Sequence, residues 1–245
     1  MPDKASHKHE PVALVIPAYN EGLRIGDLLG TLCQVGMLSR IIVVDDGSTD
    51  GTAAVVQASA RTDPRIQLLR IADNRGKAAA MVAGAEASGC DLIAFIDADL
   101  IQLRPEHVID LIEPVRTGTC SMTLGLFTGG RWTTDNSHRL SPFLSGQRCL
   151  RWSLFRGIPD LDTSRAGIEI ALSLYAWRHG YRVCPVHWRG VTHVMKIEKM
   201  GMLRGNLSHF KMYGEILRYL LHSLTADRRE PRLSKPRWAG GSRED

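Results

Sequence analysis

Four short, largely apolar runs that alternate with helical patterns place the tightest limit on the fold of this chain. The runs cover residues 12–16, 41–44, 66–70 and 92–96. They lack a helical period and are short, so they predict buried strands. Between them lie segments of helical composition, such as the alanine-rich stretch at 78–87. The alternation predicts a parallel, doubly wound α/β sheet.

A cluster of polar residues follows each of these runs. The clusters occupy residues 17–21, 45–52, 74–77 and 97–99. The C-terminal ends of parallel strands lie along one edge of a sheet, and open α/β sheets bind ligands there. We therefore expect these four clusters, which are far apart in the sequence, to share one crevice.

The last cluster contains two aspartates in D-x-D spacing, Asp97 and Asp99. On an extended stretch, residues i and i+2 point the same way. Both carboxylates can then bind one hard cation such as Mg²⁺ or Mn²⁺, or one can hold the metal and the other a ribose hydroxyl. The alternative is a strand-end loop with two solvated aspartates, because D-x-D is a common tripeptide.

In chain order the four clusters read P-A-Y-N-E, V-V-D-D-G-S-T-D-G-T, N-R-G-K and D-A-D-L. Together they resemble the family 2 glycosyltransferases with the GT-A fold, over residues 11–195. The resemblance implies a Rossmann-like, mostly parallel central sheet flanked by helices, with a C-terminal helical extension. It also implies transfer of a sugar from a nucleotide-diphosphate donor, usually with inversion and with Mg²⁺ or Mn²⁺ as cofactor. The pattern is most similar to polyprenyl-phosphate sugar transferases and small cytosolic members of the family.

The resemblance assigns roles to single residues at these strand ends. The expected donor-binding residues are Pro17, Tyr19, Glu21, Asp46, Lys77 and, at the ribose, Asp97, with Asp99 at the metal. A lysine beside a glycine can place positive charge near the leaving diphosphate. Structural alternatives remain: Pro17 can shape a turn, and Lys77 can be a surface lysine. Asp50 and Thr52 fit a helix N-cap and first turn better than ligand contacts.

Three residues of the second half have implied roles as well. By alignment with the family, Glu169 is the catalytic base that takes the proton from an acceptor hydroxyl. A glutamate at the start of a helix is the alternative, and a phosphate acceptor needs no base. Arg148 suits an anionic acceptor group or a structural salt bridge. His193, after a strand expected at 181–183, is a further metal ligand or a structural histidine.

Two other segments bear on the acceptor. Residues 124–146 are rich in Gly, Ser, Thr and Asn and are expected to form a long irregular loop. In relatives that act on polyprenyl phosphate, a glutamine commonly follows D-A-D-L directly. Here Ile101 takes that place and Gln102 comes one residue later, which turns its side chain to the other face of an extended stretch.

Composition sets the outer limits. The 245 residues can bury one good core, and no apolar run is long enough to span a bilayer. The polar start argues against a signal peptide, and five widely spaced cysteines suit free thiols in the cytoplasm. The expected organisation is a polar tail at 1–10, the GT-A domain at 11–195, an amphipathic helical segment at 196–231 and a disordered basic tail at 232–245.

A leucine-rich stripe at 202–224 has three competing uses. It can pack on the core, form a homodimer interface, or lie on the inner face of an anionic membrane, which would fit a lipid-linked acceptor. The net charge of +5 permits nucleic acid binding, but no motif supports it.

The function expected from the sequence is therefore transfer from a UDP-sugar, favoured over a GDP-sugar, to an unidentified acceptor. A non-catalytic protein of the same fold that binds sugar nucleotides or serves as a scaffold is the alternative. A phospho-switch of the receiver type is disfavoured, because its acid pair follows the first strand and here Asp45 and Asp46 follow the second.

Overall fold

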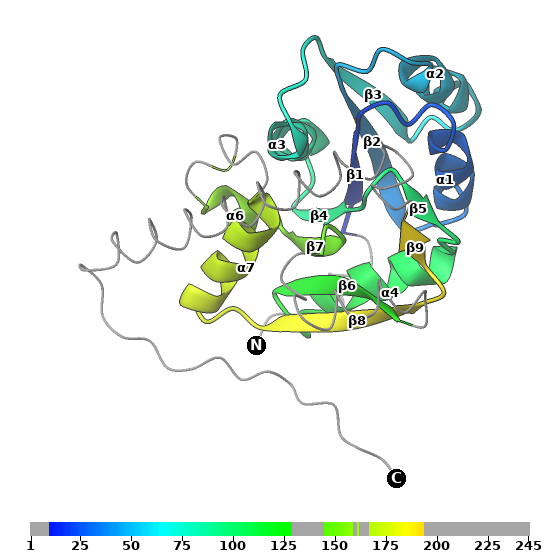
Figure 1. Ribbon diagram of the computed structural model, residues 1–245. Coiled ribbons are helices and arrows are strands. Elements are labelled where there is room, and N and C mark those ends of the chain that lie inside the picture. Colours follow the sequence, from blue (N-terminus) through cyan, green and yellow to red (C-terminus); the bar gives the residue numbers. More distant parts are fainter. Residues whose placement is uncertain (1–9, 129–144, 159–160, 162–166, 194–245) are drawn as a thin grey trace, which may run out of the picture.

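The computed structural model describes residues 10–128, 145–158, 161 and 167–193. Within these residues a seven-stranded sheet has the order β3-β2-β1-β4-β7-β6-β8, and β5 and β9 form a separate two-stranded sheet. Helices cover both faces of the large sheet (Figure 1). The sheet is mixed and mostly parallel, which confirms the predicted α/β class.

The first half of the chain forms the parallel part of the sheet. Its strands are β1 (Val12–Ala18), β2 (Leu38–Asp46), β3 (Ile66–Ile71) and β4 (Leu92–Phe95). Its helices are α1 (Ile25–Leu32), α2 (Thr52–Thr62) and α3 (Lys77–Ser88). β1 pairs in parallel with both β2 and β4. The four predicted strands and the helices between them are confirmed.

The second half adds antiparallel pairs. Its elements are β5 (Leu100–Ile101), α4 (Pro105–Arg116), β6 (Met122–Thr128), β7 (Arg148–Arg151), α6 (Trp152–Arg156), α7 (Ile168–Arg178), β8 (Val183–Arg189) and β9 (Thr192–His193). β7 is antiparallel to both β4 and β6, whereas β6 and β8 are parallel.

Two predictions for this half need correction. The expected loop at 124–146 begins inside strand β6, whose paired residues continue to Thr128. Residues 129–144 lie outside the described residues. The strand expected at 181–183 begins at Val183 and continues to Arg189. Both errors have a local cause, since Gly125 lies in β6 and Pro185 in β8, and glycine and proline weaken a strand pattern.

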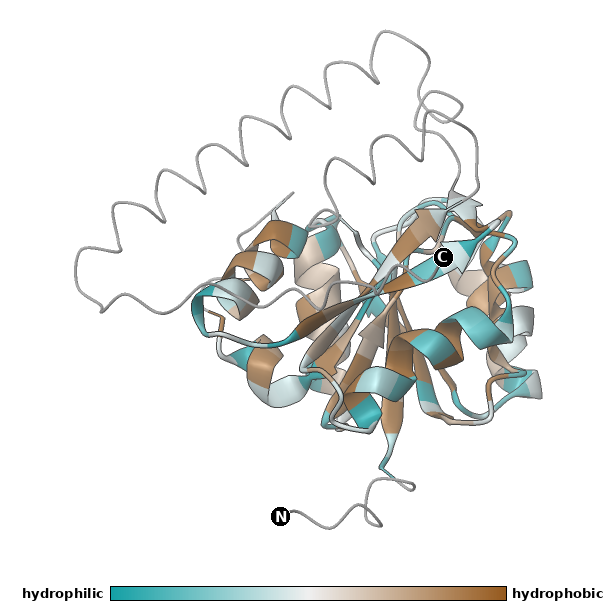
Figure 2. Cartoon of the chain, turned by 90° about the horizontal axis from the view of Figure 1, so that it is seen from below, coloured by the Kyte–Doolittle hydropathy of each residue, from teal (hydrophilic) through white to brown (hydrophobic). Residues whose placement is uncertain are grey.

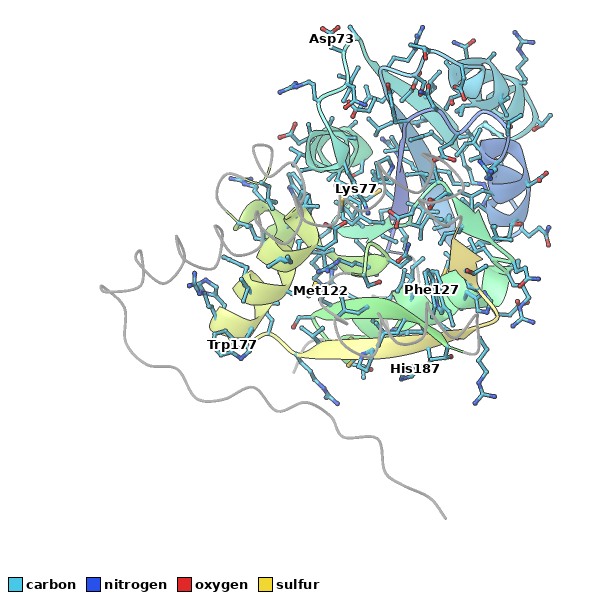
Figure 3. All side chains as sticks on the ribbon, viewed as in Figure 1. Asp73, Lys77, Met122, Phe127, Trp177 and His187 are labelled. Carbon is cyan, nitrogen blue, oxygen red and sulfur yellow. The ribbon has the colours of Figure 1, made fainter. Side chains whose placement is uncertain are left out.

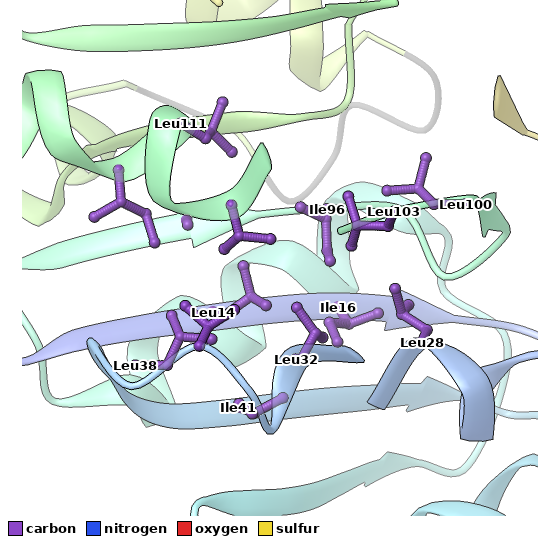
Figure 4. Packing of buried hydrophobic residues seen from close by; sticks show 14 of the residues in the cluster. Leu14, Ile16, Leu28, Leu32, Leu38, Ile41, Ile96, Leu100, Leu103 and Leu111 are labelled. Carbon is purple, nitrogen blue, oxygen red and sulfur yellow. The ribbon is translucent and has the colours of Figure 1, made fainter. Parts of the chain in front are cut away.

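The core lies on both faces of the large sheet. Leu14 and Ile16 belong to one cluster, with residues of α1, α2 and α4, whereas Val15 belongs to another, with residues of α3, α6 and α7. This is the two-residue alternation of a strand that is buried on both faces. Figure 4 shows the first cluster between the sheet and its helices, and Figure 2 shows the hydrophobic strands between more polar helix surfaces.

Several predictions about the termini concern residues that are not described. The polar tail before Glu10, the stripe at 202–224 and the basic tail at 232–245 lie outside the described residues. None of the helices that are described is long and apolar enough to cross a membrane. All five cysteines are described and have free thiols; Cys33 and Cys184 are only partly buried.

Candidate active site

The loops after β1 and β2 are tied together at the edge of the sheet. The Thr52 hydroxyl accepts a hydrogen bond from the backbone N–H of Glu21 at 2.9 Å, and Asp50 Oδ2 accepts one from Gly22 at 3.0 Å. Asp50 Oδ1 also accepts from the backbone N–H of Thr52, at the start of α2. Thr52 begins α2 as expected, but the N-cap is Gly51 and among the described residues no side chain caps this helix, so the N-cap role expected of Asp50 is wrong; both side chains instead brace the loop after β1.

Asp46 braces the next loop. It is 3% exposed, and its two oxygens accept hydrogen bonds from the backbone N–H groups of Arg75 at 2.8 Å and Gly76 at 2.7 Å. Gly47 has φ +73°, and a Cβ there would come within 2.8 Å of the Asn74 backbone nitrogen. The loops after β2 and β3 are thus in close contact, as the shared-crevice prediction requires.

The other residues expected around the nucleotide differ in exposure. Pro17 lies inside β1, paired with Val44 of β2, rather than in a turn. Tyr19 is 46% exposed just beyond the strand and is available to a ligand. Glu21 is buried, with its Oε2 3.9 Å from the guanidinium of Arg24.

Lys77 forms the centre of an ion cluster in the crevice. It is the first residue of α3, directly after Gly76 at φ +93°. Its Nζ lies 2.5 Å from Asp97 Oδ1, beyond β4, and 2.8 Å from Glu169 Oε1, in the first turn of α7. Burial alone would lower the pKa of this ammonium, but the two carboxylates raise it above its ordinary value. The two ion pairs of Lys77, which is labelled in Figure 3, distinguish it from an ordinary surface lysine.

The segment that precedes β7 completes this cluster. Gln147 Nε2 donates a hydrogen bond to Asp97 Oδ2 at 2.9 Å. Gly146 lies so close that a Cβ on it would be 2.6 Å from both Asp97 Oδ2 and Lys77 Nζ. The sequence analysis missed Gln147. Its only signal was its position beside Arg148, in S-G-Q-R.

Arg148 is fully buried beneath the cluster. Its Nε donates to the Ser145 carbonyl oxygen at 2.8 Å and its Nη1 to the Ser173 hydroxyl at 3.1 Å. Burial lowers its pKa to about 10, against the raising effect of Glu169 and Asp97. With no exposed surface, Arg148 fits the structural alternative better than direct contact with an acceptor.

The two residues expected at the metal have neighbouring backbone positions at the small sheet. Asp99 is partly exposed and directly precedes β5, and β5 pairs with β9 so that Leu100 lies opposite His193. The register places the backbone of His193 near that of Asp99, and a carboxylate with an imidazole suits Mn²⁺. In the part of the chain that is described, no group of three or more His, Cys, Asp or Glu side chains is close enough to hold a metal on its own.

With this geometry established, comparisons with known proteins identify the family. Residues 13–171, more than half of the chain, match the model of Glycosyl transferase family 2, so the chain belongs to that family. The sequence is similar to the undecaprenyl-phosphate 4-deoxy-4-formamido-L-arabinose transferase of Pseudomonas aeruginosa, at 38% identity over 112 residues, 44% of this chain and 33% of that protein. It is also similar to the glucosyl-3-phosphoglycerate synthase of Mycolicibacterium paratuberculosis, at 34% identity over 119 residues, 47% of this chain and 36% of that protein. The chain thus spans about a third of the length of these curated relatives.

A solved structure confirms the fold. Glucosyl-3-phosphoglycerate synthase from Mycobacterium tuberculosis, in complex with Mn²⁺, UDP and glucosyl-3-phosphoglycerate, matches with a TM-score of 0.65 at 22% identity. The match covers 88% of this chain and 81% of that one. The predicted GT-A fold is confirmed.

Proposed function

We propose that this protein is a metal-dependent glycosyltransferase that moves a sugar from a nucleotide-diphosphate donor to an acceptor, with inversion. The observation that carries the proposal is the Lys77–Asp97–Glu169 cluster, at the strand edge where sheets of this kind bind ligands. We favour a UDP-sugar, because the Mycobacterium tuberculosis neighbour was solved with UDP.

The donor half of the crevice is suited to a diphosphate. Lys77, at the first turn of α3, offers an ammonium and a helix N-terminus on the same side. In this proposal Tyr19 lies against the base, and Pro17, Glu21 and Asp46 shape the pocket around it. Asp97 accepts hydrogen bonds from the ribose.

The residues at the small sheet would hold Mg²⁺ or Mn²⁺. Asp99 offers a carboxylate, and His193, whose backbone lies opposite Leu100, is the proposed second ligand. When bound, the cation would offset the negative charge that develops on the leaving diphosphate. Without a cation to offset this charge, the diphosphate would be a poor leaving group.

Glu169 is the proposed base. Its side chain is 13% exposed and reaches the crevice from the first turn of α7. An acceptor hydroxyl that attacks the anomeric carbon loses its proton to the Glu169 carboxylate as the bond to the diphosphate breaks. An acceptor whose attacking oxygen belongs to an ionised phosphate does not need this step.

The acceptor site and the cellular location belong to the same proposal. We propose a cytoplasmic enzyme with an acceptor that is lipid-linked, as the name of the Pseudomonas relative suggests. Residues 202–224 would then lie on the inner face of the membrane, with packing on the core and a homodimer as the alternatives. Because Arg148 is fully buried, we propose that it does not touch the acceptor and instead supports the residues beneath the acceptor site.

The test is a melting experiment with UDP and GDP, each with and without Mn²⁺. A ligand that binds the native state raises the melting temperature, by an amount that reflects its concentration relative to Kd. We expect the largest rise with UDP and Mn²⁺ together. Asp99→Ala should remove the Mn²⁺-dependent part and abolish metal-dependent turnover, whereas Asp110→Ala, an exposed aspartate in α4, should change neither.

Two outcomes would contradict the proposal. If neither nucleotide raises the melting temperature with Mn²⁺, the crevice is not a nucleotide site. If UDP binds but no UDP-sugar releases UDP with Mn²⁺ and any acceptor, the protein is a non-catalytic nucleotide binder. Full Mn²⁺-dependent activity of Asp99→Ala would overturn the metal assignment alone.

A further inference from the structure

Gly146 and Gln147 lie against one side of the Asp97 carboxylate. Gln147 is 2% exposed, and its Nε2 donates to Asp97 Oδ2 at 2.9 Å. The contact joins residues 50 positions apart and exists because β7 lies antiparallel beside β4. Gly146 permits it, because any side chain there would collide with Asp97 and Lys77.

The amide of Gln147 has a defined orientation. The Ser145 hydroxyl donates to the Gly125 carbonyl oxygen and lies 3.1 Å from Gln147 Oε1. The backbone N–H of Gly125 donates to the backbone carbonyl oxygen of Gln147 at 2.9 Å, which holds the main chain of Gln147 in place. Turning the amide over would place Oε1 against the carboxylate of Asp97, which repels it. The charge of the Asp97 carboxylate therefore directs the amide N–H of Gln147 toward it.

This contact gives the two oxygens of Asp97 different neighbours. Oδ2 receives a neutral donor from Gln147, whereas Oδ1 lies 2.5 Å from the ammonium of Lys77. Because the Gln147 amide carries no net charge, it leaves the negative charge of Asp97 available to a cation. It can hold the carboxylate in place when Lys77, a metal or a donor hydroxyl takes the other oxygen.

We propose that Gln147 is a positioning residue, which fixes the Asp97 carboxylate so that Oδ1 faces the donor. This inference rests on the proposed function. Gln147 does not touch the donor itself; it acts through Asp97. A hydrogen bond to a charged group contributes more than a neutral one, so its loss should weaken donor binding measurably.

The test measures UDP affinity by calorimetry at saturating Mn²⁺, and the melting temperature without ligand. Gln147→Met keeps the length and fits a buried site, but it cannot donate. We expect UDP to bind about 10-fold more weakly, with the change in turnover appearing mainly in the donor KM. Gln147→Glu, which places a second carboxylate beside Asp97, should weaken UDP further. Gln67→Met, at an exposed position of β3, is the matched control and should bind UDP like the wild type.

The outcomes separate this inference from the proposed function. If the wild type does not bind UDP or GDP, the proposed function fails, and this inference with it. If the wild type binds UDP and Gln147→Met is folded and binds it equally well, only the role of Gln147 is overturned. Should Gln147→Met not fold, Ser145→Ala gives the answer: unchanged UDP affinity there overturns the proposal, and a loss of several-fold supports it.

Discussion

Two charged clusters in this protein look alike but differ in how they are built. One joins Asp63 and Arg65 in the turn between α2 and β3, with Arg65 Nη2 2.6 Å from Asp63 Oδ2. The other joins Lys77, Asp97 and Glu169 in the crevice. The first pairs residues two positions apart, whereas the second gathers residues from α3, the end of β4 and α7.

The partners of the charges separate the two clusters. The Arg65 guanidinium donates to the carbonyl oxygens of Cys33, Val35 and Leu38 as well as to Asp63, so it holds the end of α1 and the start of β2 to this turn. In the crevice, the Lys77 ammonium lies on two carboxylates from separate elements, and the exposure of its side chain is close to that of Arg65, at 32% against 26%. The first arrangement suits stability and the second suits binding.

Glu169→Gln should cause the largest loss of activity, because Glu169 is the proposed catalytic base in the crevice. The change keeps size and hydrogen bonding but removes the base. With a hydroxyl acceptor, turnover should fall by roughly 10²–10⁴-fold, while UDP affinity changes little. The measurement is kcat and UDP affinity for both forms. Glu86→Gln, at an exposed position of α3, controls for the loss of a carboxylate.

The outcome for Glu169→Gln also sorts acceptors. A small loss of turnover would indicate an acceptor that is already ionised, such as a phosphate. A loss of UDP affinity equal to the loss of turnover would show that Glu169 supports the donor site through Lys77, and its assignment as base would be wrong.

Lys77→Met should have the next largest effect. It removes the ammonium between Asp97 and Glu169 and leaves two carboxylates facing each other. We expect kcat/KM for the donor to fall by about 10²-fold, because both carboxylates lose their counter-ion and the donor diphosphate loses a positive charge. Arg61→Met, an exposed cation of α2, is the control. Unchanged donor KM in Lys77→Met would show that Lys77 acts only as an internal counter-ion.

The two clusters also show what the sequence could predict. The strand-end motifs up to Asp99 were readable because each depends on one local run, and parallel order brings their ends to one edge. Lys77, Asp97 and Glu169 were each singled out, and the structure brings them together. Their mutual pairing was not predicted, since it depends on how α7 packs against α3 and β4 across the sheet.

The roles of Gln147 and Arg148 were harder to predict from the sequence. Their positions depend on β7, which pairs antiparallel with both β4 and β6. The register of such a strand is set by contacts distant in the sequence, and a one-residue slip would exchange the faces of these two neighbours. The sequence left Arg148 open between an acceptor contact and a structural role, and the register, which buries it fully, favours the structural one.

Asp63→Asn should have the smallest effect on activity, and it tests whether the Asp63–Arg65 cluster contributes to stability alone. The hydrogen bonds from Arg65 hold the pKa of Asp63 well below its ordinary value of 3.8, despite the opposing effect of burial. A carboxyl group with a lowered pKa stabilises the fold above its ordinary pKa, and this contribution is lost as the pH falls. At neutral pH the variant should lose about 1–3 kcal/mol of unfolding free energy. That difference should shrink as the pH is lowered below about 4.

Denaturant unfolding from pH 7 to pH 2 measures this stability difference, and kcat per folded molecule is measured alongside it at pH 7. An unchanged kcat with lowered stability would confirm that the Asp63–Arg65 cluster stabilises the fold. A lowered kcat at full stability would show that this cluster also affects the active site, which would contradict the difference proposed between the two clusters.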